Sequence, residues 1–179
     1  ALLVQGSSGE TVLDNVAVSR VGSGGDNHQA VLVGLSGTLR LNHTTLSATN
    51  GNSAHAIFLH PGPVNVYIED SDLSASGANG NIVVQLGFVS STTGSSLTVQ
   101  GSSLSATGGN ATSLYVDGTH AVEIAHSKLS SAFRYLDIRG GSPTFKSRFN
   151  ELRGALYNET GALTCTASVD ESDAFSATG

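Results

Sequence analysis

Two groups of polar residues have the types and the spacing that catalysis requires. Asp70 and Asp72 are separated by one residue. Glycosidases catalyse hydrolysis with a pair of carboxyl groups a few ångströms apart. Tyr135, Asp137 and Arg139 alternate with apolar residues, so a strand here would turn all three toward solvent together. A lyase needs a base and a cation that neutralises an acidic substrate. Both groups are therefore catalytic candidates.

Each group also has an explanation without catalysis. The two aspartates fit a loose row of polar side chains on an exposed strand, and the second group fits glycan contact or plain salt bridges equally well. His43 is expected beside Asp70 on the next repeat, where a hydrogen bond suffices. His126 would lie two repeats from Asp70, about 10 Å away, whereas zinc ligands lie at about 2 Å. We therefore expect no metal site and no cofactor.

The elements that position these residues come from a repeated phrase. A marker residue recurs with spacings of 28, 27, 31, 25 and 23 residues, and a period in this range is typical of stacked repeats. The clearest copies of the phrase lie at Leu39–Thr49, Val66–Ser76, Leu97–Thr107 and Val122–Ala132.

Alternation within each copy predicts a strand with one face on the core and one in water. Equivalent apolar residues should then form two core rows. The first row is Leu13, Leu41, Ile68, Val99 and Ile124, and the second is Leu46, Leu73, Leu104 and Leu129.

A Gly/Asn-rich loop in each repeat leads to a second, continuously apolar strand. Strands of this kind are commonly buried on both faces. If Val31, Ile57, Ile82 and Leu114 point inward, an apolar stripe points outward. The expected partner-binding stripe is Leu32, Phe58, Val83 and Tyr115. Soluble monomers rarely leave such a stripe uncovered, so we expect a protein partner, a neighbouring domain or a second copy on it.

These patterns predict an all-β fold, a right-handed parallel β-helix of about six to seven rungs over residues 1–165. Residues 166–179 lose the repeat and are expected to form a coil or cap. A two-sheet β-sandwich is the rival fold. We also expect the chain to be a segment of a longer secreted protein.

The charge and the apolar runs of the sequence argue against two kinds of partner, nucleic acids and membranes. The net charge is −6 and only 12% of the residues are charged, and the basic residues gather mainly between Lys128 and Arg153. A nucleic-acid-binding face is therefore not expected. No apolar run approaches the roughly 20 residues needed to span a bilayer.

Short strands, rungs of this length and Asn/Gly corners resemble the right-handed parallel β-helix proteins of the pectate-lyase-like superfamily. The resemblance covers about Leu2 to Cys165 and is architectural. Proteins of this superfamily include polysaccharide lyases and hydrolases, phage tailspikes, autotransporter passengers and secreted adhesins, so the resemblance implies one of these classes. The chain has no Trp, which the signature of calcium-type pectate lyases contains, and it lacks the polygalacturonase pattern.

Because fold alone does not specify chemistry, function depends on the loops, which are short and uncharged. We expect a non-catalytic module of a secreted or surface protein, built for adhesion, display or assembly, with a glycan as a further candidate ligand. The alternative is a polysaccharide-active enzyme (lyase, hydrolase or epimerase) or a phage tailspike segment.

Overall fold

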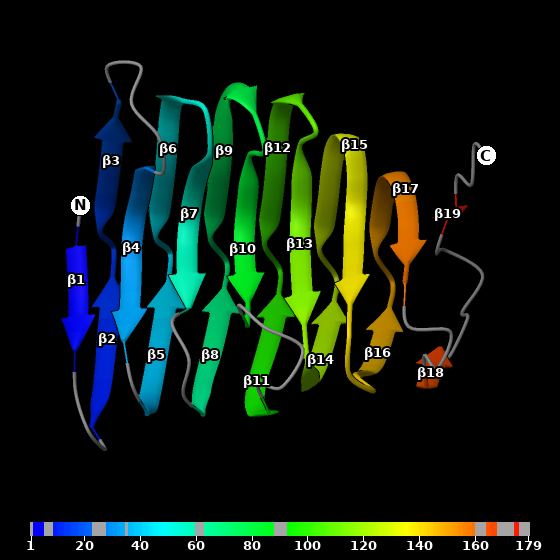
Figure 1. Ribbon diagram of the computed structural model, residues 1–179. Coiled ribbons are helices and arrows are strands. Elements are labelled where there is room, and N and C mark those ends of the chain that lie inside the picture. Colours follow the sequence, from blue (N-terminus) through cyan, green and yellow to red (C-terminus); the bar gives the residue numbers. More distant parts are fainter. Residues whose placement is uncertain are drawn as a thin grey trace.

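The structure is a computed structural model that describes residues 2–5, 9–22, 28–34, 36–59, 63–87, 93–159, 164–167 and 174–175. In these ranges all the elements are β-strands, and no helix is long and apolar enough to cross a membrane. All the strand pairings are parallel. The strands stack side by side into a solenoid (Figure 1). The all-β parallel solenoid is confirmed; the hand of the coil and the number of rungs stay predictions.

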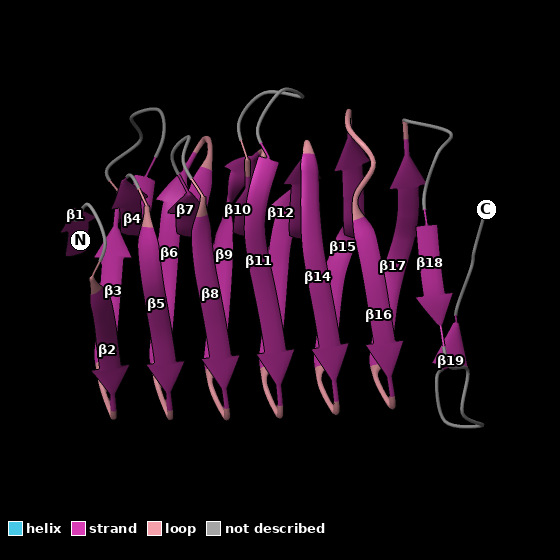
Figure 2. Ribbon diagram, turned by 90° about the horizontal axis from the view of Figure 1, so that it is seen from below, coloured by secondary structure: helices cyan, strands magenta, loops and turns pink. Residues whose placement is uncertain are grey.

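The first strand of each repeat belongs to one sheet, which faces the viewer in Figure 2. Its strands in the described residues are β2 (Glu10–Asp14), β5 (Gly37–Asn42), β8 (Val64–Glu69), β11 (Thr93–Gln100), β14 (Thr119–Ala125), β16 (Thr144–Arg148) and β18 (Thr164–Ala167).

A second set of strands follows the first corner of each repeat. The set comprises β3 (Ala17–Val21), β6 (Thr45–Gly51), β9 (Asp72–Asn79), β12 (Ser103–Gly109), β15 (Lys128–Arg139), β17 (Glu151–Asn158) and β19 (Ala174–Phe175). A third set stacks beside it, formed by β1 (Leu2–Gln5), β4 (His28–Gly34), β7 (Ala54–Leu59), β10 (Ile82–Leu86) and β13 (Thr112–Asp117). The long β15 pairs with both β12 and β13 and so joins the second and third sets into one sheet.

The core rows follow the expected register. Leu13, Leu41, Ile68, Val99 and Ile124 pair in that order through neighbouring strands, and so do Leu46, Leu73, Leu104 and Leu129. Except for Leu13, which is partly buried, every member of both rows is at most 4% exposed. Both rows are therefore confirmed. In each row, a repeat packs one leucine, isoleucine or valine against the equivalent residues of the neighbouring repeats, about 4.8 Å away on either side.

The alternation of inward and outward residues is interrupted where the chain enters the third strands, at the second corner of each repeat. As a result, Val83 and Tyr135, both expected to face outward, are buried. Val83 and Val84 are consecutive and both fully buried, and so are Ser113 and Leu114. The hydroxyl of Ser113 donates to the carbonyl oxygens of Leu104 and Ser130 on the second strands, so it points inward across the corner. Two successive residues therefore face the core where strict alternation expects one.

The expected outward position of Val83 is therefore wrong, because Val83 is the first of two successive residues that face the core. Its place in the outward row belongs to Gln85, which pairs with Phe58 on one side and Tyr115 on the other. Leu32 pairs with Phe58 through its backbone, but its side chain lies outside the described residues.

Residues 166–179 are described only in part. Thr166 and Ala167 continue β18, which pairs with β16, and β19 pairs with β17 at Glu151 and Leu152. The rest of the expected coil or cap lies outside the described residues.

Candidate functional site

One corner of the solenoid is shorter than those before it. From a buried residue of the second strand to the equivalent buried residue of the third strand, the residue number rises by 11 across the β9–β10 turn (Leu73 to Val84) and by 10 across the β12–β13 turn (Leu104 to Leu114). In β15 it rises by 7 over the same step, from Leu129 to Leu136. The chain therefore crosses this corner as one continuous strand without a projecting loop.

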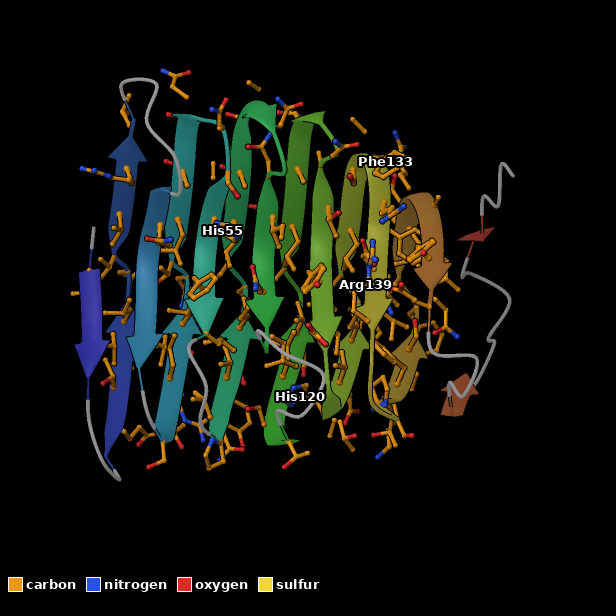
Figure 3. The ribbon with its side chains drawn as sticks, viewed as in Figure 1. His55, His120, Phe133 and Arg139 are labelled. Carbon is orange, nitrogen blue, oxygen red and sulfur yellow. The ribbon has the colours of Figure 1, made fainter. Side chains whose placement is uncertain are left out.

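The short corner opens a groove of about 360 Å³ beside the projecting loops at Gly80 and Asn110. Phe133, at the shortened corner, is 42% exposed and forms one wall. Figure 3 labels Phe133 and Arg139, both on β15. The other lining residues are Ile82, Thr112, Tyr115, Arg134, Asp137 and Arg139.

The floor of the groove is a carboxylate held by two arginines. Arg134 Nη1 donates to Asp137 Oδ2 at 2.5 Å, and Arg139 Nε donates to Asp137 Oδ1 at 2.8 Å. The Asp137 side chain is only 5% exposed. A buried carboxylate is stable only when it is paired in this way. The hydrogen bond from Arg139 to Asp137 raises the pKa of its guanidinium, so Arg139 stays charged.

Neighbouring side chains fix the orientation of both arginines. Arg139 Nη1 also donates to Glu159 Oε2 at 2.6 Å. The Tyr157 ring lies under both guanidinium groups, 4.0 Å from Arg134 Cζ and 4.6 Å from Arg139 Cζ. Such cation–π contacts are worth about 0.5–2 kcal/mol each. The two arginines and Asp137 thus form a preorganised cluster.

Two ionisable side chains of β13 lie beside this cluster. Tyr115 pairs with Asp137 and Asp117 pairs with Arg139 in the register of the strands. Burial raises the pKa of the Tyr115 hydroxyl, and the Asp117 carboxylate raises it further. Burial also raises the pKa of Asp117, although Arg139 works in the opposite direction. The Tyr115 hydroxyl and the Asp117 carboxyl group can therefore form hydrogen bonds beside the cluster, and neither adds positive charge to it.

The second catalytic candidate is only partly assembled. Asp137 and Arg139 lie together at the groove, but Tyr135 is 8% exposed and belongs to the hydrophobic core. It lies opposite Ser113 at the interrupted corner, so strict alternation misplaced it, and the outward position expected for it is wrong. Arg134 takes the place beside Asp137 that Tyr135 was expected to hold.

The first candidate, Asp70 and Asp72, lies at the opposite corner of the solenoid. Here the residue after each first strand has a left-handed backbone, with φ of 47° at His43, 45° at Asp70, 60° at Gly101 and 50° at His126. Asp70 is thus a turn residue with an exposed side chain, while Asp72 begins β9. The nearest contact of the expected pair is His43 Nε2 to Asp70 Oδ2 at 4.0 Å.

A buried polar ladder follows these turn residues. The backbone N–H of Ser71 donates to Ser102 Oγ, that of Ser102 donates to Ser127 Oγ, and that of Ser127 donates to Asn150 Oδ1. Thr44 donates in the same way to Ser71 Oγ. The ladder satisfies backbone donors that the corner would otherwise bury unpaired. Its sequence signal, a Ser, Thr or Asn directly after each turn residue, was available but was not used.

Asp72 also lines a second, open groove of about 480 Å³ with Lys128, Glu151 and the stacked rings of His126 and Phe149. The ring centroids are 5.0 Å apart. Lys128 Nζ lies 3.4 Å from Glu151 Oε2, so these charges pair with each other. This corner is accounted for by turn geometry and surface ion pairs.

Sequence reasoning missed most partners of the groove. Phe133, Tyr157, Asp117 and Glu159 were not among its candidates, and Tyr115 was assigned to a partner stripe. Comparison of the chain with protein-family models, curated proteins and solved structures finds no match.

Proposed function

We propose that this chain is a non-catalytic β-solenoid module of a secreted or cell-surface protein, and that it serves adhesion, display or assembly by presenting the Phe133–Arg139 groove to a ligand. The observation that carries the proposal is the pairing of both groove arginines with carboxylates. The low charge, the Ser/Thr/Asn-rich surface and the short corners agree with a surface module.

The ion pairs argue against a lyase mechanism. A lyase needs a cation that neutralises the acidic group of its substrate in the transition state. Releasing an arginine from the buried Asp137 carboxylate would cost on the order of 3 kcal/mol. The groove is therefore better suited to binding a ligand than to reacting with an acidic one.

Docking of a protein partner or a second copy on the outward row is the weaker form of this proposal. Phe58 and Tyr115 are half-buried, but Gln85 stands between them and Val83 faces the core. The stripe is thus less continuous than expected, and the polar cluster at its end favours a hydroxyl-bearing ligand.

A polysaccharide-active enzyme is the second candidate, because one observation favours it. Asp117 and Glu159 lie on the same face, two strands apart with Arg139 between them, which corresponds to about 9.6 Å along the stack. Inverting glycosidases separate their carboxyl groups by about 6.5–9.5 Å, so the strand spacing here lies just above that range, and their acid has a raised pKa. The raised pKa of Asp117 agrees with that role.

Incubation with a panel of neutral and uronate polysaccharides separates the two candidates. We expect neither new reducing ends nor absorbance from unsaturated uronates. Turnover that disappears in both Asp117→Asn and Arg139→Ala, but persists in the surface control Arg20→Ala, would establish the enzyme and overturn our proposal.

A further inference from the structure

The groove combines aromatic walls with a fixed polar floor. Phe133 is 42% exposed, with the Arg134 guanidinium over one face of its ring at 4.4 Å, and Tyr115 is partly exposed. The same groove is lined by the planar donors of Arg134 and Arg139 and by the acceptor Asp137. A sugar ring has apolar C–H faces, which pack on aromatic rings, and a rim of hydroxyl groups, which bond to planar polar side chains. The two kinds of surface in the groove match the two kinds of surface on a sugar.

The charge of the cluster selects between neutral and acidic sugars. Two positive groups, Arg134 and Arg139, face three carboxyl groups, Asp117, Asp137 and Glu159, so the formal charge of the cluster is 2 − 3 = −1. A uronate entering here would gain no net electrostatic attraction. A neutral sugar needs only hydrogen bonds. A guanidinium has five N–H donors, so Arg134 keeps donors beyond the one that bonds Asp137.

The groove also has a direction. Its lining residues come from three neighbouring strands, with Ile82 on β10, Tyr115 on β13 and Phe133 on β15. These three strands lie side by side (Figure 1), so the groove crosses successive rungs along the stack. An extended chain lying in it would pass over the aromatic and polar groups in turn.

We propose that the ligand of this groove is an uncharged, hydroxyl-rich polysaccharide bound along the stack across β10, β13 and β15. This inference rests on the proposed binding function and names the class of ligand. It assigns Phe133 and Tyr115 as packing surfaces, Arg134 and Arg139 as donors, and Asp137 as the group that holds the donors in place.

Titration calorimetry of the whole chain tests the proposal with defined probes. The probes are neutral hexasaccharides (cellohexaose, mannohexaose and xylohexaose) and hexagalacturonate, each at low and high salt. We expect at least one neutral probe to bind with an affinity that salt leaves unchanged. Phe133→Ala and Tyr115→Ala should each weaken binding about tenfold, since an aromatic side chain withdrawn from water contributes about that factor.

A matched control lies on the other sheet. Arg40 Cζ is 4.0 Å from the centroid of the half-buried Tyr67 ring, the same kind of contact as in the groove. Tyr67→Ala should leave binding unchanged. Because Phe133 is exposed, Phe133→Ala should fold normally and remains informative if Tyr115→Ala does not fold.

The outcomes separate this inference from the proposed function. Binding of hexagalacturonate alone, weakened by salt and by Arg139→Gln, would overturn the neutral ligand and leave a non-catalytic binding module standing. Absence of binding to every probe, or binding that Phe133→Ala does not change, would also overturn the inference. Cleavage of any probe would overturn the proposed function itself.

Discussion

His55 should make the solenoid lose stability between about pH 6.5 and pH 4. The side chain is 4% exposed, and its Nδ1 atom has no hydrogen-bond partner among the described residues. Phe58 packs edge-on against the imidazole, with ring centroids 5.3 Å apart. Burial lowers the pKa of His55 to about 4, although a hydrogen bond with Gln85 partly offsets this effect. Figure 3 labels His55 on β7.

The sign and size of the effect follow from the two pKa values. Well above pH 6.5 the imidazole is neutral in both states and contributes no pH dependence. Between pH 6.5 and pH 4 the unfolded chain binds a proton that the folded chain does not, so stability falls as the pH falls. The full loss is about 3 kcal/mol, since a difference of about 2.5 pKa units corresponds to 1.36 kcal/mol per unit. His120 adds a loss in the same direction, because burial lowers its pKa as well.

Urea unfolding at about pH 7 and about pH 4.5 measures the loss. His55→Leu should reduce the difference in unfolding free energy between these two pH values by most of the roughly 3 kcal/mol assigned to His55. His43→Gln, at a side chain 62% exposed, should leave that difference unchanged. A direct NMR titration of the His55 ring should give a midpoint near pH 4. If His55→Leu keeps the full pH dependence of the unmodified chain, the reasoning is wrong.

Three further substitutions test the packing. Ser102→Ala removes the acceptor of the buried Ser71 N–H and should cost about 1–3 kcal/mol of unfolding free energy. Tyr135→Ala should cost about 3–5 kcal/mol, because Tyr135 packs in the core rather than facing solvent. Gly108→Ala should cost more than about 1 kcal/mol, since φ is 101° and a Cβ atom would collide with the backbone oxygen of Gly77. Urea unfolding measures all three.

Each of these has a control on the same chain. Ser105→Ala on the half-exposed face of β12 should change stability by less than about 0.5 kcal/mol. Phe133→Ala, at an exposed ring, should cost clearly less than Tyr135→Ala. Gly9→Ala should be tolerated, because nothing lies within 4 Å of its added Cβ. Equal losses in a variant and its control would contradict the assigned environment.

The core was predictable because a repeat constrains itself. Val99 and Ile124 are each at the same step of a repeated phrase, so an error in one copy would conflict with the others, and the register of the first and second strands came out as expected. The third strand lacks this internal check. It is apolar throughout, so its sequence does not say which residues face inward. Two consecutive inward residues at the corner then misplaced Val83 and Tyr135.

The groove was hidden from the sequence for a related reason. Its residues come from three repeats, and bringing Phe133 beside Tyr115 depends on how many residues each corner consumes. Alternation gives the face of a residue within one strand, but it does not give the offset between strands joined by corners of unequal length. Asp137 and Arg139 were found because they share a strand; Glu159 and Tyr157 were missed because they come from the next repeat.

Corner length is therefore the variable that converts a uniform stack into a binding surface. A solenoid whose corners were all equal would place equivalent residues in continuous rows and would present ridges without a hollow. Here the loops at Gly80 and Asn110 project, the next corner retracts at Phe133, and the step between them exposes one aromatic ring and the outward face of β15. Tyr135 and Leu136 both face the core, so Arg134 and Asp137 on either side of them share the outward face and form a hydrogen bond. The shortened corner in β15 thus accounts for the shape of the groove, and the two consecutive inward residues account for the charge cluster on its floor.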